Sequence, residues 1–113
     1  MLDGAHHGNE PLSTAFVLDA IATLLDGSAR SERLLGELTV VAVPLVNPDG
    51  YASSGKGEHG RKNGRDNDRD GKPGAQDGVD LNRNYPFRWG TLREPWSSAS
   101  PGHFRYRDRK SVV

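Results

Sequence analysis

The sequence has no cysteine among its 113 residues, and aromatic side chains make up only 7% of it. Without cysteine there can be no disulfide bonds and no thiolate metal ligands, so any metal must be held by histidine and carboxylate side chains. Positive and negative side chains balance at 15 each. This balance gives no indication of a nucleic-acid partner or of an anionic membrane surface.

Long apolar runs are also missing. No stretch approaches the roughly 20 apolar residues of a membrane span, and Asp3 and Gly4 follow Met1 where a secretion signal would have basic and apolar regions. Hydrophobic residues make up 34% of the chain, below the roughly 45–50% of globular proteins, a figure that also counts glycine. The sequence predicts a soluble chain of one domain at most with a modest core. Localisation and oligomeric state stay open.

Two apolar stretches each predict one regular element. Residues 11–26 place apolar side chains at three- and four-residue steps, with Pro11 at the start and Gly27 after the end, which predicts a helix. Residues 38–46 are a continuous, β-branched run, which predicts a strand covered on both faces and weakened at Pro44. We expect a helical turn over 31–35 and a tight turn over 47–50.

The remaining segments lack such periodicity. Residues 1–2 are too short for a strand of their own, and residues 3–7 resemble the loop that follows a strand, so the start is expected to be truncated. Residues 52–78 predict a long, exposed polar loop, and residues 79–87 offer Leu81, Tyr85 and Phe87 for packing. The basic residues 91–113 predict a flexible tail.

The segment His7-Gly8-Asn9-Glu10 places an imidazole and a carboxylate three residues apart at the start of the first predicted helix. Catalytic zinc takes three protein ligands from His, Cys, Asp and Glu and keeps one position for water, so this pair could supply two of them. The alternative is a polar loop followed by a carboxylate that the helix dipole favours.

Two further positions could carry chemistry. Arg61 could stabilise an oxyanion as a fixed cation, and Asn82-Arg83 could bind a carboxylate through the guanidinium fork and an adjacent amide. The commoner role of such residues is structural or solvated, as a surface arginine and a turn asparagine.

Four landmarks, in this order, are similar to those of the zinc metallocarboxypeptidases. They are Gly4-Ala5-His6-His7-Gly8-Asn9-Glu10, Asn47-Pro48-Asp49-Gly50-Tyr51, Arg61-Lys62-Asn63 and Asp80-Leu81-Asn82-Arg83-Asn84-Tyr85-Pro86. The resemblance covers residues 1–90. It implies an α/β fold with a mixed central sheet flanked by helices, of which this chain would hold the N-terminal part.

The resemblance also implies roles for single residues. His7 and Glu10 would be zinc ligands, and Arg61 would polarise the scissile carbonyl and stabilise its oxyanion. Asn82 and Arg83 would bind the free C-terminal carboxylate of a peptide or protein substrate. Tyr51 would be structural.

Three parts of the family's site lie beyond the matching residues: a second histidine ligand, a substrate-binding tyrosine and the glutamate that serves as general base. The sequence offers His6, His59 and His103 in place of the missing ligand, and Glu58 and Glu94 in place of the base. None of them is expected to take over, so we expect an incomplete catalytic domain.

An acidic segment, residues 66–77, resembles a calcium-binding loop. Gly71 holds the sixth position, where such loops turn sharply. The carboxylates that would bind calcium are those of Asp66, Asp68, Asp70 and Asp77. The alternative is a solvated acidic insertion whose charges are balanced by nearby arginine and lysine residues.

Two other functions stay open. Deacylases of the aspartoacylase and succinylglutamate desuccinylase type carry similar His-Gly-Asn-Glu and Asp-Leu-Asn-Arg stretches, although the second and third landmarks favour the peptidase. The chain could also be a non-catalytic module that binds calcium or a peptide C-terminus through Asn82 and Arg83.

Overall fold

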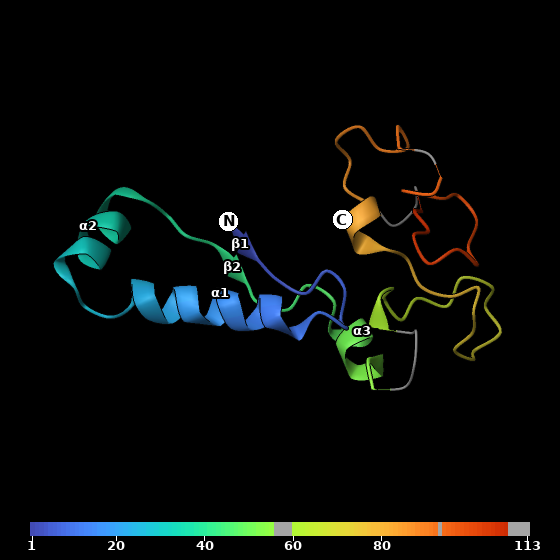
Figure 1. Ribbon diagram of the computed structural model, residues 1–113, viewed down its shortest axis with the longest axis horizontal. Helices are drawn as coiled ribbons and strands as arrows, with labels where there is room; N and C mark the ends of the chain where they lie inside the picture. Colours follow the sequence, from blue (N-terminus) through green and yellow to red (C-terminus); the bar gives the residue numbers. More distant parts are fainter. Residues whose placement is uncertain (56–59, 93, 109–113) are drawn as a thin grey trace.

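Helices and strands are concentrated in the first half of the chain. The structure, a computed structural model, describes residues 1–55, 60–92 and 94–108. Figure 1 shows α1, α2, β1 and β2 at one end of an elongated molecule, α3 near its middle, and the segments after residue 60 folded mainly as loops at the other end. The described elements are β1 (Leu2–Asp3), α1 (Pro11–Leu24), α2 (Ala29–Glu37), β2 (Ala42–Val43), α3 (Pro48–Ser53) and a 3-10 helix (Leu81–Arg83).

The first predicted helix is confirmed as α1, which begins at Pro11 and ends two residues before the predicted end. The predicted turn at 31–35 is part of a longer helix, α2. Ser28 caps α2 by accepting a hydrogen bond from the Ser31 backbone N–H, and the Ser31 hydroxyl donates to the Thr23 carbonyl of α1 over 2.9 Å. A serine cap therefore starts this helix where apolar spacing alone indicated only a turn.

The predicted strand over 38–46 is wrong in length, because only Ala42–Val43 pairs as a strand. Its partner is β1, which was not expected as a strand, and the two run parallel with Leu2 opposite Ala42 and Asp3 opposite Val43. Strand pairing cannot extend beyond the partner, and β1 has two residues. The expected burial on both faces is not seen either, since Val41 and Val43 are exposed.

The expected mixed central sheet is represented in the described residues by this one parallel pair. Together with the three helices, it gives an α/β arrangement of small extent.

The turn predicted at 47–50 is also wrong, since Pro48–Ser53 forms the helix α3. Asn47 caps α3, and Pro48 is its first residue, so the residues that indicate a turn also provide the start signals of a helix.

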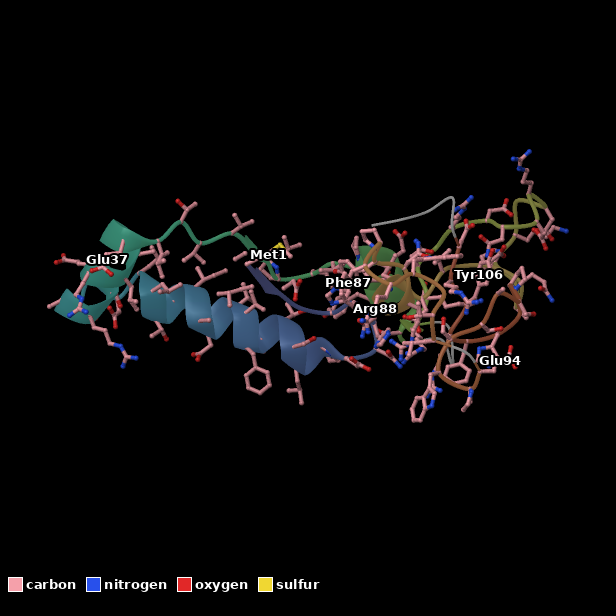
Figure 2. All side chains as sticks on the ribbon, turned by 90° about the horizontal axis from the view of Figure 1, so that it is seen from above. Met1, Glu37, Phe87, Arg88, Glu94 and Tyr106 are labelled. Atoms are coloured by element: carbon pink, nitrogen blue, oxygen red, sulfur yellow. The ribbon has the colours of Figure 1, made fainter. Side chains whose placement is uncertain are left out.

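Few apolar side chains are buried. In the described residues, the buried hydrophobic positions are Ala5, Val17 and Val79. The large apolar side chains that remain exposed include Leu12, Phe16, Leu18, Leu25, Leu38 and Val41. Figure 2 shows side chains projecting from α1 on the side away from the strands. The Cα radius of gyration of 16.7 Å exceeds the roughly 13 Å of a compact domain of this length.

No single described helix is long and apolar enough to span a membrane, although α1 and α2 taken together have the length and composition, with a bend of 101° between them.

Residues 94–108, which lie in the predicted flexible tail, make hydrogen bonds to the rest of the chain. Examples are the bond from the Asp80 N–H to the Tyr106 carbonyl and the bond from Lys62 Nζ to the Pro101 carbonyl. Flexibility of this segment stays a prediction.

Candidate functional site

The loop between β1 and α1 carries His6, His7 and Glu10 at the helix entrance. Its backbone is fixed against β2 and the segment after it, since Gly4 N–H donates to the Val43 carbonyl and Asn47 N–H donates to the Ala5 carbonyl. Glu10 directly precedes α1, and its N–H donates to the His7 carbonyl over 3.1 Å. This tight turn brings the side chains of His7 and Glu10 to the same side of the loop.

Asn47 connects three separate segments around this loop. Its side-chain amide donates to the carbonyls of His6 and Arg61, at 3.1 and 3.3 Å, and its oxygen accepts from the Gly50 N–H at 2.8 Å. The residue is 1% exposed, so these bonds are shielded from competing water. Asn47 therefore holds the backbones of His6 and Arg61 against the start of α3.

His7 lies between two carboxylates. Its Nδ1 is 3.0 Å from Oε1 of Glu10, and its Nε2 is 3.1 Å from Oδ1 of Asp80. An ionised aspartate can only accept hydrogen bonds, so Asp80 favours the tautomer of His7 with a proton on Nε2, while Nδ1 faces Glu10. The ring orientation is thus set by a residue at the start of the 3-10 helix.

Arg61 binds the other oxygen of the same carboxylate. Its Nε and Nη2 donate to Oδ2 of Asp80 at 3.0 and 2.8 Å, and its Nη1 lies 3.5 Å from Nδ1 of His7. The structure therefore brings His7, Glu10 and Arg61 together around one buried aspartate, although Arg61 is far from the other two in the sequence.

Asp80 is the residue that sequence reasoning missed as part of this group. Burial by itself raises the pKa of the Asp80 carboxyl, but the hydrogen bond from His7 and the charge of Arg61 outweigh burial and hold the pKa below its usual value. The Asp80 side chain is fully buried. An acid directly after the apolar Val79, within the fourth landmark, was the available signal in the sequence.

The donor atoms of His7 and Glu10 suit a zinc ion. Two ligands on one tetrahedral zinc lie about 3.3 Å apart, given bonds of about 2.0–2.1 Å, and the observed separation is 3.0 Å. Metal-bound histidines usually donate their other ring N–H to a carboxylate, as His7 does to Asp80. In the described part of the chain, no third metal-binding side chain joins His7 and Glu10 within 4.8 Å.

Asn82 and Arg83 follow Asp80 on the 3-10 helix but face a different area. The Asn82 N–H donates to Oδ1 of Asp80 over 3.1 Å. Arg83 donates from Nε to the Trp96 carbonyl at 2.6 Å and from Nη1 to the Asn82 carbonyl at 2.9 Å. Both residues line a small hollow of about 100 Å³, with Tyr85 and Trp89 among its other walls.

The alternative ligands and bases lie elsewhere. His6 points to the Tyr85 hydroxyl, with which its Nε2 makes a short hydrogen bond, in agreement with the expectation that it points away from His7. His103 stacks on Phe104 and accepts from the Arg105 N–H, and Glu94 accepts from the Ser98 hydroxyl. Glu58 and His59 lie outside the described residues.

The acidic loop brings its carboxylates together. One oxygen from each of Asp66, Asp68, Asp70 and Asp77 lies within 4.8 Å of the others. Gly71 adopts a positive φ of 74°, and its N–H donates to Asp66 over 3.0 Å. The hydrogen bond from the Asp70 N–H is the largest single influence on Asp68 and lowers its pKa, but burial and the charges of Asp70, Asp77 and Asp66 together outweigh this bond and leave the pKa of Asp68 raised.

Comparison with known proteins gives one family. Residues 1–112 match the family described as "Zinc carboxypeptidase", so the match extends beyond residue 90, where the landmarks end. The chain is 31% identical over 103 residues to a "Metallocarboxypeptidase A-like protein" of Trichophyton verrucosum, covering 88% of this chain and 23% of that protein. No solved structure matches the chain.

Two other relatives differ in what their names say about activity. The chain is 37% identical over 92 residues to human "Carboxypeptidase Z", covering 75% of this chain and 13% of that protein. It is 32% identical over 110 residues to an "Inactive metallocarboxypeptidase ecm14" of Talaromyces stipitatus, covering 91% of this chain and 18% of that protein. The chain thus spans less than a third of the length of these relatives.

Proposed function

Because the chain belongs to the zinc carboxypeptidase family, we propose that it supplies part of an active site that removes C-terminal residues from peptides. The observation that carries the proposal is the convergence of His7, Glu10 and Arg61 around the buried Asp80. This arrangement offers two metal ligands and a fixed cation within one small volume.

Each residue has a separate part in this proposal. His7 through Nδ1 and Glu10 through Oε1 would hold zinc, which when bound activates water and polarises a carbonyl. Arg61 would stabilise negative charge on the substrate, since Asp80 occupies Nε and Nη2 and leaves Nη1 on the His7 side. Asn82 and Arg83 would hold the substrate's C-terminal carboxylate.

For these 113 residues alone we propose zinc binding without turnover. Two protein ligands bind zinc more weakly than three, and the third ligand and general base are expected in the part of the relatives that this chain does not span. Some relatives carry names that include the word inactive, which makes an activity assay essential.

Zinc binding is the first test of the site. His7→Ala and Glu10→Gln should each weaken zinc binding by at least about tenfold in calorimetric titration, because each removes a donor atom, and even indirect partners of metal ligands matter by 10–100-fold. His103→Ala is the matched control, since His103 stacks on Phe104 and is not one of the proposed zinc ligands. Equal zinc affinity for the unaltered chain and the His7→Ala variant would refute the site.

The reaction requires a version of the protein extended to the length of its relatives. Peptidase function predicts release of the last residue from a peptide with a free C-terminus but not from its C-terminal amide, because Asn82 and Arg83 would bind the carboxylate. Hydrolysis of an N-acyl amino acid in place of the peptide would support the deacylase alternative. Binding of free C-termini without hydrolysis would support the non-catalytic module.

We also propose calcium as a ligand of the acidic loop, since four carboxylates converge there and hard cations prefer oxygen ligands at such spacing. Calcium should slow tryptic cleavage after Arg65 and Arg69 compared with chelator, because the ion would order the loop. Asp70→Asn should remove this protection, and Asp19→Asn on α1 should keep it. Equal cleavage with calcium and with chelator would exclude calcium binding.

A further inference from the structure

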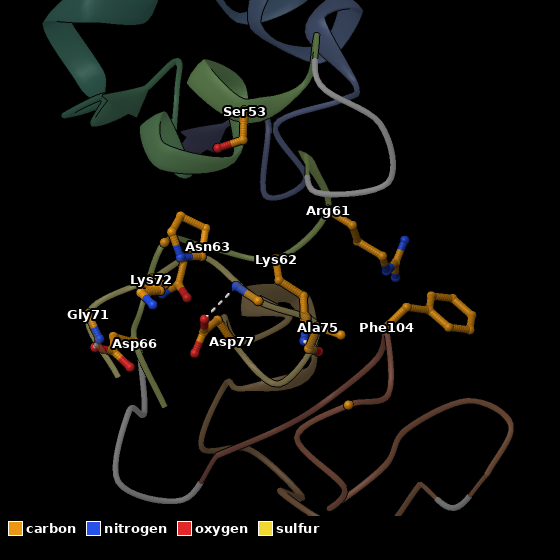
Figure 3. Close-up of a pocket in the computed structure, with 14 residues that line it drawn as sticks. Ser53, Arg61, Lys62, Asn63, Asp66, Gly71, Lys72, Ala75, Asp77 and Phe104 are labelled. Carbon is orange, nitrogen blue, oxygen red and sulfur yellow. Dashed lines mark hydrogen bonds between the residues drawn. The ribbon is translucent and has the colours of Figure 1, made fainter. Parts of the chain in front are cut away.

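The loop of residues 94–108 contacts both arginines of the candidate site. At its start, the Trp96 carbonyl accepts a hydrogen bond from Nε of Arg83. Further along, the Phe104 ring lies against Arg61, with Cζ of Arg61 5.5 Å from the ring centroid. Figure 3 shows the ring beside the guanidinium group. One loop therefore reaches two side chains to which the proposed function gives separate tasks.

This loop has internal bonds that fix its shape. Ser98 N–H donates to the Arg105 carbonyl at 3.1 Å, and Arg107 N–H donates to the Ser98 carbonyl at 2.9 Å. Ser97 and Ser98 are almost fully buried. The loop is fastened to the site through Tyr106, whose carbonyl accepts the Asp80 N–H at 2.8 Å.

Arg61 is consequently held from two directions. Within the plane of its guanidinium group, Asp80 accepts two hydrogen bonds. From another side, Cζ of Arg61 lies over the ring of Phe104, which is two residues from the attachment point at Tyr106. The hydrogen bonds fix where the donors point, while an aromatic ring beneath the cation attracts it and shields it from water on that side. The two constraints together leave Nη1 on the side of His7.

We propose that Phe104 is a positioning residue that holds the guanidinium of Arg61 in the orientation needed for substrate binding. The value of that orientation for catalysis rests on the proposed function, whereas the orientation itself does not. Arg61 and Phe104 both border an open hollow of about 410 Å³, shown in Figure 3. A small reagent can therefore reach the guanidinium from this hollow.

The test is arginine modification by phenylglyoxal on the full chain, with the rate at each arginine read by mass spectrometry of its peptides. Phe104→Ala should raise the rate at Arg61 by about 2- to 5-fold, the factor that corresponds to an exposed cation–π contact. Phe104→Tyr should restore the original rate, because it keeps an aromatic face. Phe16→Ala, at an exposed position on α1, is the matched control and should leave the rate unchanged.

Two outcomes would overturn the assignment. One is an unchanged rate at Arg61 in Phe104→Ala. The other is an equal rise at Arg61 and at Arg65, which pairs with Asp108, because it would indicate general loosening of the fold.

Zinc titration of the same variants separates the proposed role of Phe104 from the proposed zinc site. Phe104→Ala should keep the zinc affinity within about twofold, since the proposed ligands of zinc are His7 and Glu10. Failure of zinc binding in the unaltered chain would refute the zinc site and leave the Arg61 result intact.

Discussion

Gly8→Ala is expected to destabilise the chain by about 3 kcal/mol or more, at or above the upper end of the overpacking range. A Cβ at this position would lie 1.9 Å from the Tyr51 nitrogen and 2.0 Å from the Gly50 carbonyl carbon. Both are backbone atoms of α3, so no side chain can rotate away. Either the helix or the loop between His7 and Glu10 must move, and urea unfolding should show the loss.

The same substitution should weaken zinc binding, since moving the loop separates Nδ1 of His7 from Oε1 of Glu10. Gly36→Ala is the matched control. A Cβ there would have no neighbour within 4 Å, and an alanine inside α2 should stabilise the chain by about 0.5–1 kcal/mol. Comparable stabilities for the two variants would contradict the close packing of the loop on α3.

What could be predicted from the sequence was largely local. The position of α1 follows from the spacing of its apolar residues and from Pro11, and Glu10 and His7 lie together because they are three residues apart. The proximity of Arg61 to this pair had no local signal and was implied only by the resemblance. Fifty-four positions separate Arg61 from His7, and Asn47 bridges that separation in space.

The predictions that failed have a common cause: the residues that the segment would contact are either missing or far away in the sequence. Residues 38–46 have the composition of a buried strand, yet pairing needs a neighbour, and β1 offers two residues. Asp80 looked like an ordinary acid of the fourth landmark because its partners, His7 and Arg61, are 73 and 19 positions away. Composition and periodicity describe what a segment can do, while contacts across the chain decide which of these options is realised.

The exposed apolar side chains fit the same explanation. Leu12 and Phe16 on α1 contribute to the predicted apolar pattern, but α1 in the described structure buries only Val17. The sequence pattern is therefore that of a helix with more neighbours than these residues supply. Since the chain spans less than a third of its relatives' length, the stability of these 113 residues should depend strongly on the few buried polar contacts at the site.

Asp80→Asn tests that dependence most directly. An amide can offer one oxygen as acceptor, so it cannot accept from both His7 and Arg61 as the two carboxylate oxygens do. Its NH₂ group would face donors on one side, and Arg61 would lose its counter-charge. Breaking one partner of a buried ion pair costs about 3–5 kcal/mol, and we expect about 3 kcal/mol because Arg61 keeps 20% of its side chain exposed.

Loss of the carboxylate should also weaken zinc binding by about 10- to 100-fold, because Asp80 orients the ring of His7. Glu37→Gln provides the control, since the Arg33–Glu37 pair lies on the surface of α2 with side chains 81% and 67% exposed. Removing that charge should cost under about 0.5 kcal/mol and leave zinc affinity unchanged. If Asp80→Asn unfolds at the same urea concentration as Glu37→Gln, the buried aspartate does not organise the site, and the bonds from the Asn47 side chain to the carbonyls of His6 and Arg61 must suffice to hold these two segments together.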